Sequence, residues 1–111
     1  MKYLLLIGFV LSQAVSAYDG LSGVTTVEYI YSPVDGSLPY VQFGDNSMSG
    51  CHDNNGGYLP VTNVEGGERT YSLLLAAYMS KSPVAVYYKY VNTDPNYNGW
   101  GKCHILAVDL R

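Results

Sequence analysis

The pattern of apolar residues changes its period once, between Arg69 and Val91. The first half has apolar side chains at the spacing of one helical face, at Tyr71, Leu74, Leu75 and Tyr78. We therefore expect a helix over 69–81, with Lys81 in its last turn. Ser82-Pro83 should end it, because proline cannot continue helical hydrogen bonding. From Val84 the period becomes two, which predicts a strand over 84–91 with Val84, Val86, Tyr88 and Tyr90 on one face and Ala85, Tyr87, Lys89 and Val91 on the other.

Four other stretches are rich in β-branched and aromatic residues and are typical of strands, over 23–33, 38–43, 58–61 and 103–110. Asp35-Gly36 marks a hairpin turn between the first two strands. Pro60 places the third strand at an edge or an end of the sheet. In the last strand, one face should carry Cys103, Ile105 and Ala107, and the other His104, Leu106 and Val108.

The resulting order is β-β-β-α-β-β in one domain, with polar loops over 44–57 and 92–102. In so short a chain this order predicts a mainly β fold, a small five-stranded barrel like the oligonucleotide/oligosaccharide-binding (OB) fold, with one helix between strands three and four. An open α+β sandwich with one helix on the sheet is the alternative. Strand periodicity does not separate the two.

Residues 1–17 have the composition of a signal peptide. A positive start at Lys2 is followed by a nearly apolar run over 3–10 and by the small residues Ser16 and Ala17. The apolar run is shorter than the ~20 residues of a membrane span. We expect cleavage before Tyr18 and a single OB-like domain over 18–111, secreted from a bacterium through the periplasm.

Two cysteines, Cys51 and Cys103, lie far apart in the chain. In an exported protein they most simply form one disulfide, which stabilises a small core by closing a long loop. A reactive or metal-binding thiol pair is the alternative. It is less favoured, because there is no Cys-x-x-Cys pattern and because export favours oxidation.

The formal net charge is −3, and it becomes −4 when Lys2 leaves with the signal peptide. Neither nucleic acid nor an anionic membrane surface is an expected partner, since both need a basic face. Tyrosine is the outlier in composition, with twelve in the chain and eleven of them after residue 17. Tyrosine is common in strands and also in binding surfaces, where its ring combines apolar area with a hydroxyl, so this abundance fits either.

No catalytic or metal-binding pattern is recognisable. His52 and His104 have no ligand partner at a known spacing, and Asp45, Asp53 and Asp94 lack the spacing of a calcium loop. We expect no enzymatic activity, no cofactor and no metal. Sugar rings stack on aromatic faces and bond Lys and hydroxyl groups at their rim, so the expected binding surface is the cluster Tyr87, Tyr88, Lys89, Tyr90, Tyr97 and Trp100. The alternative is that the strand tyrosines are half-buried sheet residues and that Trp100 fills a loop.

Three short motifs add to this picture: Asp19-Gly20-Leu21-Ser22-Gly23-Val24, Leu38-Pro39-Tyr40, and the strand motif Pro83-Val84-Ala85-Val86-Tyr87-Tyr88-Lys89 after the helix. Together they resemble the B subunits of AB5 toxins of the subtilase cytotoxin and typhoid toxin type. The strand motif is the most specific of the three. The family's cysteine in the second strand is replaced here by Gln42.

The resemblance implies a non-enzymatic OB-fold subunit in a ring of five, which recognises sialylated host glycans and delivers a separate A subunit. It also implies glycan contacts from Ser22, Tyr88 and Lys89, with Asp19 in support. A Ser hydroxyl and a Lys ammonium suit a sialic carboxylate. The alternative function is an exported protein-binding module, either a hydrolase inhibitor or a component of a secreted complex.

One conflict arises within the proposed glycan site. Strict alternation puts Tyr88 and Lys89 on opposite faces of their strand. Both can reach one ligand only near a strand end or at a bulge, where the pleat is broken.

Overall fold

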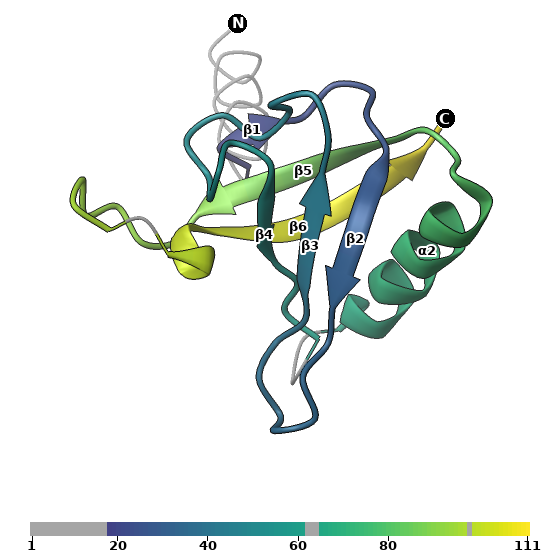
Figure 1. Ribbon diagram of the computed structural model, residues 1–111, viewed down its shortest axis with the longest axis horizontal. Coiled ribbons are helices and arrows are strands. Elements are labelled where there is room, and N and C mark those ends of the chain that lie inside the picture. Colours follow the sequence, from purple (N-terminus) through teal and green to yellow (C-terminus); the bar gives the residue numbers. More distant parts are fainter. Residues whose placement is uncertain (1–17, 62–64, 98) are drawn as a thin grey trace, which may run out of the picture.

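The computed structural model describes residues 18–61, 65–97 and 99–111, so the expected signal peptide lies outside the described residues. Within these described ranges, six strands form one open mixed sheet in the order β1-β5-β6-β4-β3-β2, with helix α2 beside it (Figure 1). The elements are β1 Gly20–Leu21, β2 Val27–Tyr31, β3 Tyr40–Phe43, β4 Gly56–Tyr58, α2 Gly67–Ser80, β5 Val84–Tyr90, the 3-10 helix η1 Trp100–Lys102, and β6 Cys103–Leu110.

The mainly β class and the helix before β5 are confirmed, but the predicted five-stranded barrel is wrong. Over the described residues the sheet is open, and it has six strands. The additional strand is β1, which has only two residues and is therefore too short for alternation to reveal. The stretch expected to be a single strand over 23–33 contains only β2, which begins at Val27.

Both outer strands of the sheet, β1 and β2, come from one stretch of chain, Gly20–Tyr31. The first part pairs with β5, and an isolated bridge between Thr25 and Val84 extends this pairing. The second part pairs antiparallel with β3. One segment therefore borders the sheet on both sides.

Strand β4 lies inside the sheet, so the edge position predicted from Pro60 is wrong. It pairs antiparallel with β3 and parallel with β6. Pro60 lies beyond its last residue and removes no ladder hydrogen bond. Gly57 allows the close approach of β6, because a Cβ at this position would lie 2.7 Å from the carbonyl oxygen of Cys103.

Helix α2 starts two residues before its predicted start and ends at Ser80. Lys81 is not in the last turn. It is the C-cap residue, with a left-handed φ of 55°, and its N–H donates to the carbonyl groups of Ala77 and Tyr78. Ser82-Pro83 follows the helix as predicted.

The buried face of α2 differs in part from the predicted one. Leu74 is buried as predicted, but Leu75 and Tyr78 are 37% and 38% exposed, and Ala77 is buried instead. The reason is the close packing of the first turn of the helix against the preceding chain. Gly67 lies so close to the chain before the helix that a Cβ would be 2.5 Å from the carbonyl oxygen of Pro60. This contact turns the face of Gly67, Leu74 and Ala77 toward the sheet.

The core lies between α2 and the inner faces of the strands. Its buried apolar members include Val41, Phe43, Met48, Leu59, Leu74, Val84, Val86, Tyr88 and Ile105. Strand β5 keeps the predicted alternation. Strand β6 does not, because the register shifts so that Tyr87 pairs with Ala107 and Tyr88 with Ile105, which leaves Leu106 between them. This bulge moves Val108 to the core side.

The predicted disulfide between Cys51 and Cys103 is confirmed, and both residues are buried. It joins the polar loop after β3 to the start of β6. Such a bond is consistent with an oxidising, exported environment. Among the residues that the structure describes, no helix has both the length and the apolar character needed to cross a membrane.

Candidate functional site

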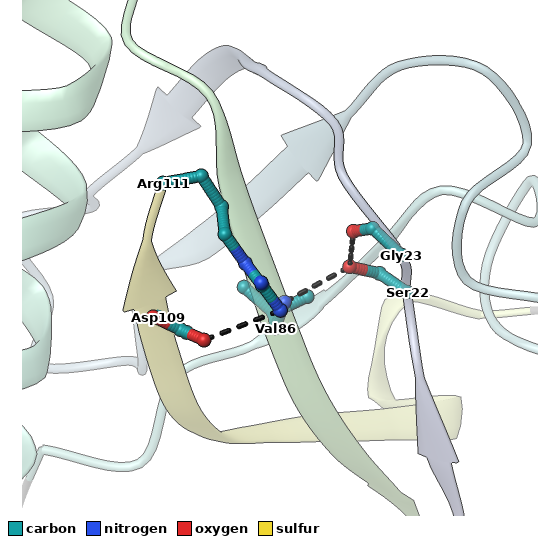
Figure 2. Close-up of polar contacts among 5 residues, drawn as sticks. All are labelled: Ser22, Gly23, Val86, Asp109 and Arg111. Atoms are coloured by element: carbon teal, nitrogen blue, oxygen red, sulfur yellow. Dashed lines mark hydrogen bonds and ion pairs between the residues drawn. The ribbon is translucent and has the colours of Figure 1, made fainter.

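Asp19 and Ser22 hold the first segment of the chain against β5. The Ser22 hydroxyl donates to the carbonyl oxygen of Gly23 (2.7 Å) and accepts from the N–H of Val86 (2.9 Å), as Figure 2 shows. One carboxylate oxygen of Asp19 accepts from the N–H of Tyr90 at 2.8 Å. Because its proton and one lone pair are engaged, the Ser22 hydroxyl offers a ligand its second lone pair, as an acceptor.

Tyr88 and Lys89 lie on opposite faces of β5. Tyr88 is 4% exposed and belongs to the core, with its ring against Gly20. Burial, followed by the nearby Tyr90, raises the pKa of Tyr88. Lys89 is exposed on the other face, which we call the outer face of the sheet. The bulge lies in β6 and leaves the β5 alternation intact, so it does not bring these two side chains together.

One row of side chains crosses the outer face from β2 to the β1 edge. Adjacent strands pair Tyr31 with Tyr40, Tyr40 with Tyr58, Tyr58 with His104, and His104 with Lys89. Asp19 continues the row, since its N–H donates to the carbonyl of Tyr88, next to Lys89. Directly paired residues project to one face, and at about 4.8 Å per strand the row measures roughly 24 Å along the sheet. The row consists of Tyr31, Tyr40, Tyr58, His104, Lys89 and Asp19.

Two further groups lie on the outer face near Ser22, and of their members only Tyr87 was predicted to bind a sugar. The rings of Tyr18 and Tyr87 are in contact, with centroids 5.0 Å apart. The guanidinium of Arg111 lies 3.3 Å from the carboxylate of Asp109. Asp109 and Arg111 are spaced two apart, and this spacing could have placed both on one strand face.

In the view of Figure 2 the side chain of Arg111 passes in front of β5 with its guanidinium at Asp109, and Ser22 bonds the N–H of Val86 from the β1 edge of the same strand. The Arg111–Asp109 pair is about half exposed. An exposed pair of this kind contributes about 1 kcal/mol or less, so the guanidinium can exchange its partner for a ligand at little cost. We call the following group the β5 outer patch: the outer-face residues Tyr18, Asp19, Tyr87, Lys89, Asp109 and Arg111, with Ser22 beside them at the strand edge, where its backbone pairs with the core residue Val86.

Trp100 from η1 covers the other end of the row. Its ring stacks on Tyr40 at 4.5 Å and meets the edge of Tyr31 at 5.3 Å. Tyr40 is fully buried beneath it, and burial raises the pKa of Tyr40 far above its usual value. Tyr31 is 50% exposed. Of the aromatic residues predicted for a binding surface, Tyr87 and Trp100 thus lie on the outer face, whereas Tyr88 does not.

His104 lies between Tyr58 and Lys89 in the row, and burial lowers its pKa. Below about pH 6.5, the ordinary pKa of histidine, the unfolded chain binds a proton that the folded chain resists. The free energy of unfolding is therefore expected to fall as the pH drops from about 7.5 to about 5.5. Urea unfolding at both pH values measures this fall in the free energy of unfolding. The fall should be smaller for His104→Asn than for the unchanged protein. An equal fall in the two proteins would contradict the assignment of this pH dependence to His104.

The outer face does not have the composition of a metal site. Within residues 18–61, 65–97 and 99–111, no group of three or more His, Cys, Asp or Glu side chains is placed to hold a metal ion. What the face offers is aromatic area, two cations, two carboxylates and a fixed hydroxyl. This set is suited to binding a polar ligand that has rings.

Comparison of the chain with protein-family models, with curated protein sequences and with solved structures finds no match in any of the three. The resemblance to the B subunits of AB5 toxins therefore rests on the three sequence motifs.

Proposed function

We propose that this chain is an exported, non-enzymatic glycan-binding protein that recognises sialylated host glycans with its β5 outer patch. The observation that carries the proposal is the cross-strand row, which brings Lys89 and Asp19 into line with Tyr58 and Tyr31 on the face opposite the core. The accessible members of the row, which do not include the buried Tyr40, can contact several units of an oligosaccharide. The AB5-like role, with a ring of five and a separate A subunit, is part of the same proposal and rests on the motif resemblance.

Each group of the patch has a role in holding a sialic acid. The carboxylate of the sugar accepts charge-assisted hydrogen bonds from Arg111 or Lys89. The ring of Tyr87, supported by Tyr18, supplies a face for the apolar side of the sugar. Ser22 accepts from a sugar hydroxyl, and Asp19 fixes the strand edge beside it. Tyr88 contributes from the core face of the sheet, as a buried residue that holds β5 in place.

Replacement of Lys89 by Ala is expected to weaken binding of a sialylated glycan by about tenfold or more, because one charge-assisted hydrogen bond is lost. Ser22→Ala should weaken binding to a smaller extent, since it removes one neutral acceptor. A glycan array, followed by titration of the best ligand by calorimetry, measures both effects.

The matched control is Arg69→Ala, which removes an exposed cation from α2 and should leave binding unchanged. If the unchanged protein binds no sialylated glycan on the array, the proposal fails. The proposal also fails if Lys89→Ala, Ser22→Ala and Arg69→Ala all bind with the same affinity.

A second candidate function is an exported protein-binding module, and one observation favours it. The solvent side of α2 carries Leu75, Tyr78 and Met79, with Met79 80% exposed. Exposed apolar side chains grouped on one surface are typical of contacts with another protein.

Light scattering separates the ring of five from the protein-binding module. A monomer at micromolar concentration contradicts the ring, and a partner lost on Met79→Glu but kept on Lys89→Ala supports the module.

A further inference from the structure

A hollow of about 260 Å³ opens at the end of β5, away from the β5 outer patch. It is lined by Tyr90, Gly50, the loop over 92–95 and Lys102. Tyr90 follows Lys89 in the strand and therefore projects to the opposite face. Its ring contacts that of Tyr88, with centroids 6.0 Å apart. The hollow is thus a separate concavity.

The walls of the hollow are fixed by covalent and hydrogen bonds. Gly50 precedes Cys51 and Lys102 precedes Cys103, so the disulfide joins the two walls directly behind the hollow. The Tyr90 hydroxyl donates to the carbonyl oxygen of Ser49 at 3.0 Å, which fixes the ring. A concavity held in this way needs little ordering when a ligand binds.

The loop that forms the third wall is also held in shape. A side-chain oxygen of Asn92 accepts from the N–H of Asp94 at 3.1 Å, and one of Asp94 accepts from the N–H of Asn96 at 3.0 Å. The carbonyl oxygen of Lys102 accepts from the N–H of Val91 at 2.8 Å. These bonds leave the side-chain NH2 group of Asn92 and the second carboxylate oxygen of Asp94 available to a ligand.

The chemistry of the walls indicates a sugar that carries an acid group. The Tyr90 ring and Pro95 offer apolar faces, while Asn92, Thr93 and Asp94 offer hydrogen-bonding groups at the rim. Lys102 supplies a cation, and its ammonium has no carboxylate within ion-pair distance among the residues that the structure describes. The volume is below that of a pocket for a drug-sized molecule, and so suits a single sugar ring.

We propose that this hollow is a second saccharide site, which takes one sugar unit with a carboxylate bonded to Lys102 and its ring against Tyr90. It goes beyond the function proposed for the β5 outer patch and does not depend on it. The two sites share no residue, so either can be lost while the other remains.

The test is an NMR titration of the ¹⁵N-labelled protein with glucuronic acid and, separately, with glucose as the neutral counterpart. Glucuronic acid is expected to shift the backbone amide signals of residues 92–94, which line the hollow. Glucose should bind at least about tenfold more weakly, because it lacks the group that bonds to the Lys102 ammonium. Lys102→Ala should reduce the affinity for glucuronic acid by a similar factor.

Lys89→Ala is the matched control, since it removes an exposed lysine from the same strand but from the outer face. It should leave the glucuronic acid shifts of residues 92–94 unchanged, even though it weakens sialylated glycan binding at the β5 outer patch. The second site is refuted if these amides do not shift at the highest soluble concentration of glucuronic acid. It is also refuted if the shifts persist unchanged in Lys102→Ala. Neither result bears on the β5 outer patch, which the Ser22 and Lys89 variants test.

Discussion

Replacement of both Cys51 and Cys103 by Ala is expected to lower the free energy of unfolding by about 4 kcal/mol. The bond closes a loop between residues 52 apart in the sequence, and in the chain-entropy model a loop of this length adds that much by restricting the unfolded chain. A domain of this size has only about 5–15 kcal/mol of stability, so the loss is a large part of the total. Urea unfolding followed by far-UV circular dichroism measures it.

The unchanged protein under reducing conditions is the control for the cysteine prediction. With the disulfide reduced, it should unfold at nearly the same urea concentration as the double variant, because neither then carries the cross-link. A double variant as stable as the oxidised protein would show that the bond contributes nothing to folding. Binding in the hollow beside Tyr90 should be lost in the double variant, since Gly50 and Lys102 are no longer joined through it.

Leu74→Ala is expected to destabilise the protein by about 3 kcal/mol, because Leu74 is fully buried between α2 and the sheet. The cost has two parts: the loss of apolar burial and the cavity that the smaller side chain leaves. The same urea experiment measures it, as a lower midpoint with an unchanged slope.

The neighbouring residue provides a matched control for Leu74. Leu75→Ala makes the same chemical change, in the same helix and with the same change in helix propensity, but at a side chain that is 37% exposed. It should cost less than about 1 kcal/mol. Equal losses at the two positions would mean that α2 does not pack on the sheet as described.

The elements that the sequence predicted well are those with long, regular patterns. The strand over 103–110 is found with the same bounds, and β5 begins at Val84 as expected. The strand β4 lay partly outside the prediction because two of its three residues are glycines, which carry no alternation. Its position inside the sheet depends on the close approach of Gly57 to the Cys103 backbone, a contact between distant parts of the chain.

The candidate site could be predicted only in part for a similar reason. Lys89 could be placed on an exposed face from alternation alone. The use of the Ser22 hydroxyl to bond the N–H of Val86 could not, because it depends on a pairing of segments 64 residues apart. The bulge at Leu106 also reverses the faces of β6, which places Asp109 and Arg111 beside β5 on the outer face. No local pattern in the strand shows where such an extra residue falls.

The origin of both outer strands in the stretch Gly20–Tyr31 bears on how this protein can associate with other chains. Unpaired strand edges invite the addition of a foreign strand, and long flat edges lead to aggregation. Here the two outer strands are only two and five residues long, and both belong to one segment that is bonded at each end to a neighbouring strand. In the part of the chain that the structure describes, the sheet thus presents no long free edge. Copies of this chain, or its partners, should meet through side-chain surfaces such as the exposed side of α2 and not by extending the sheet.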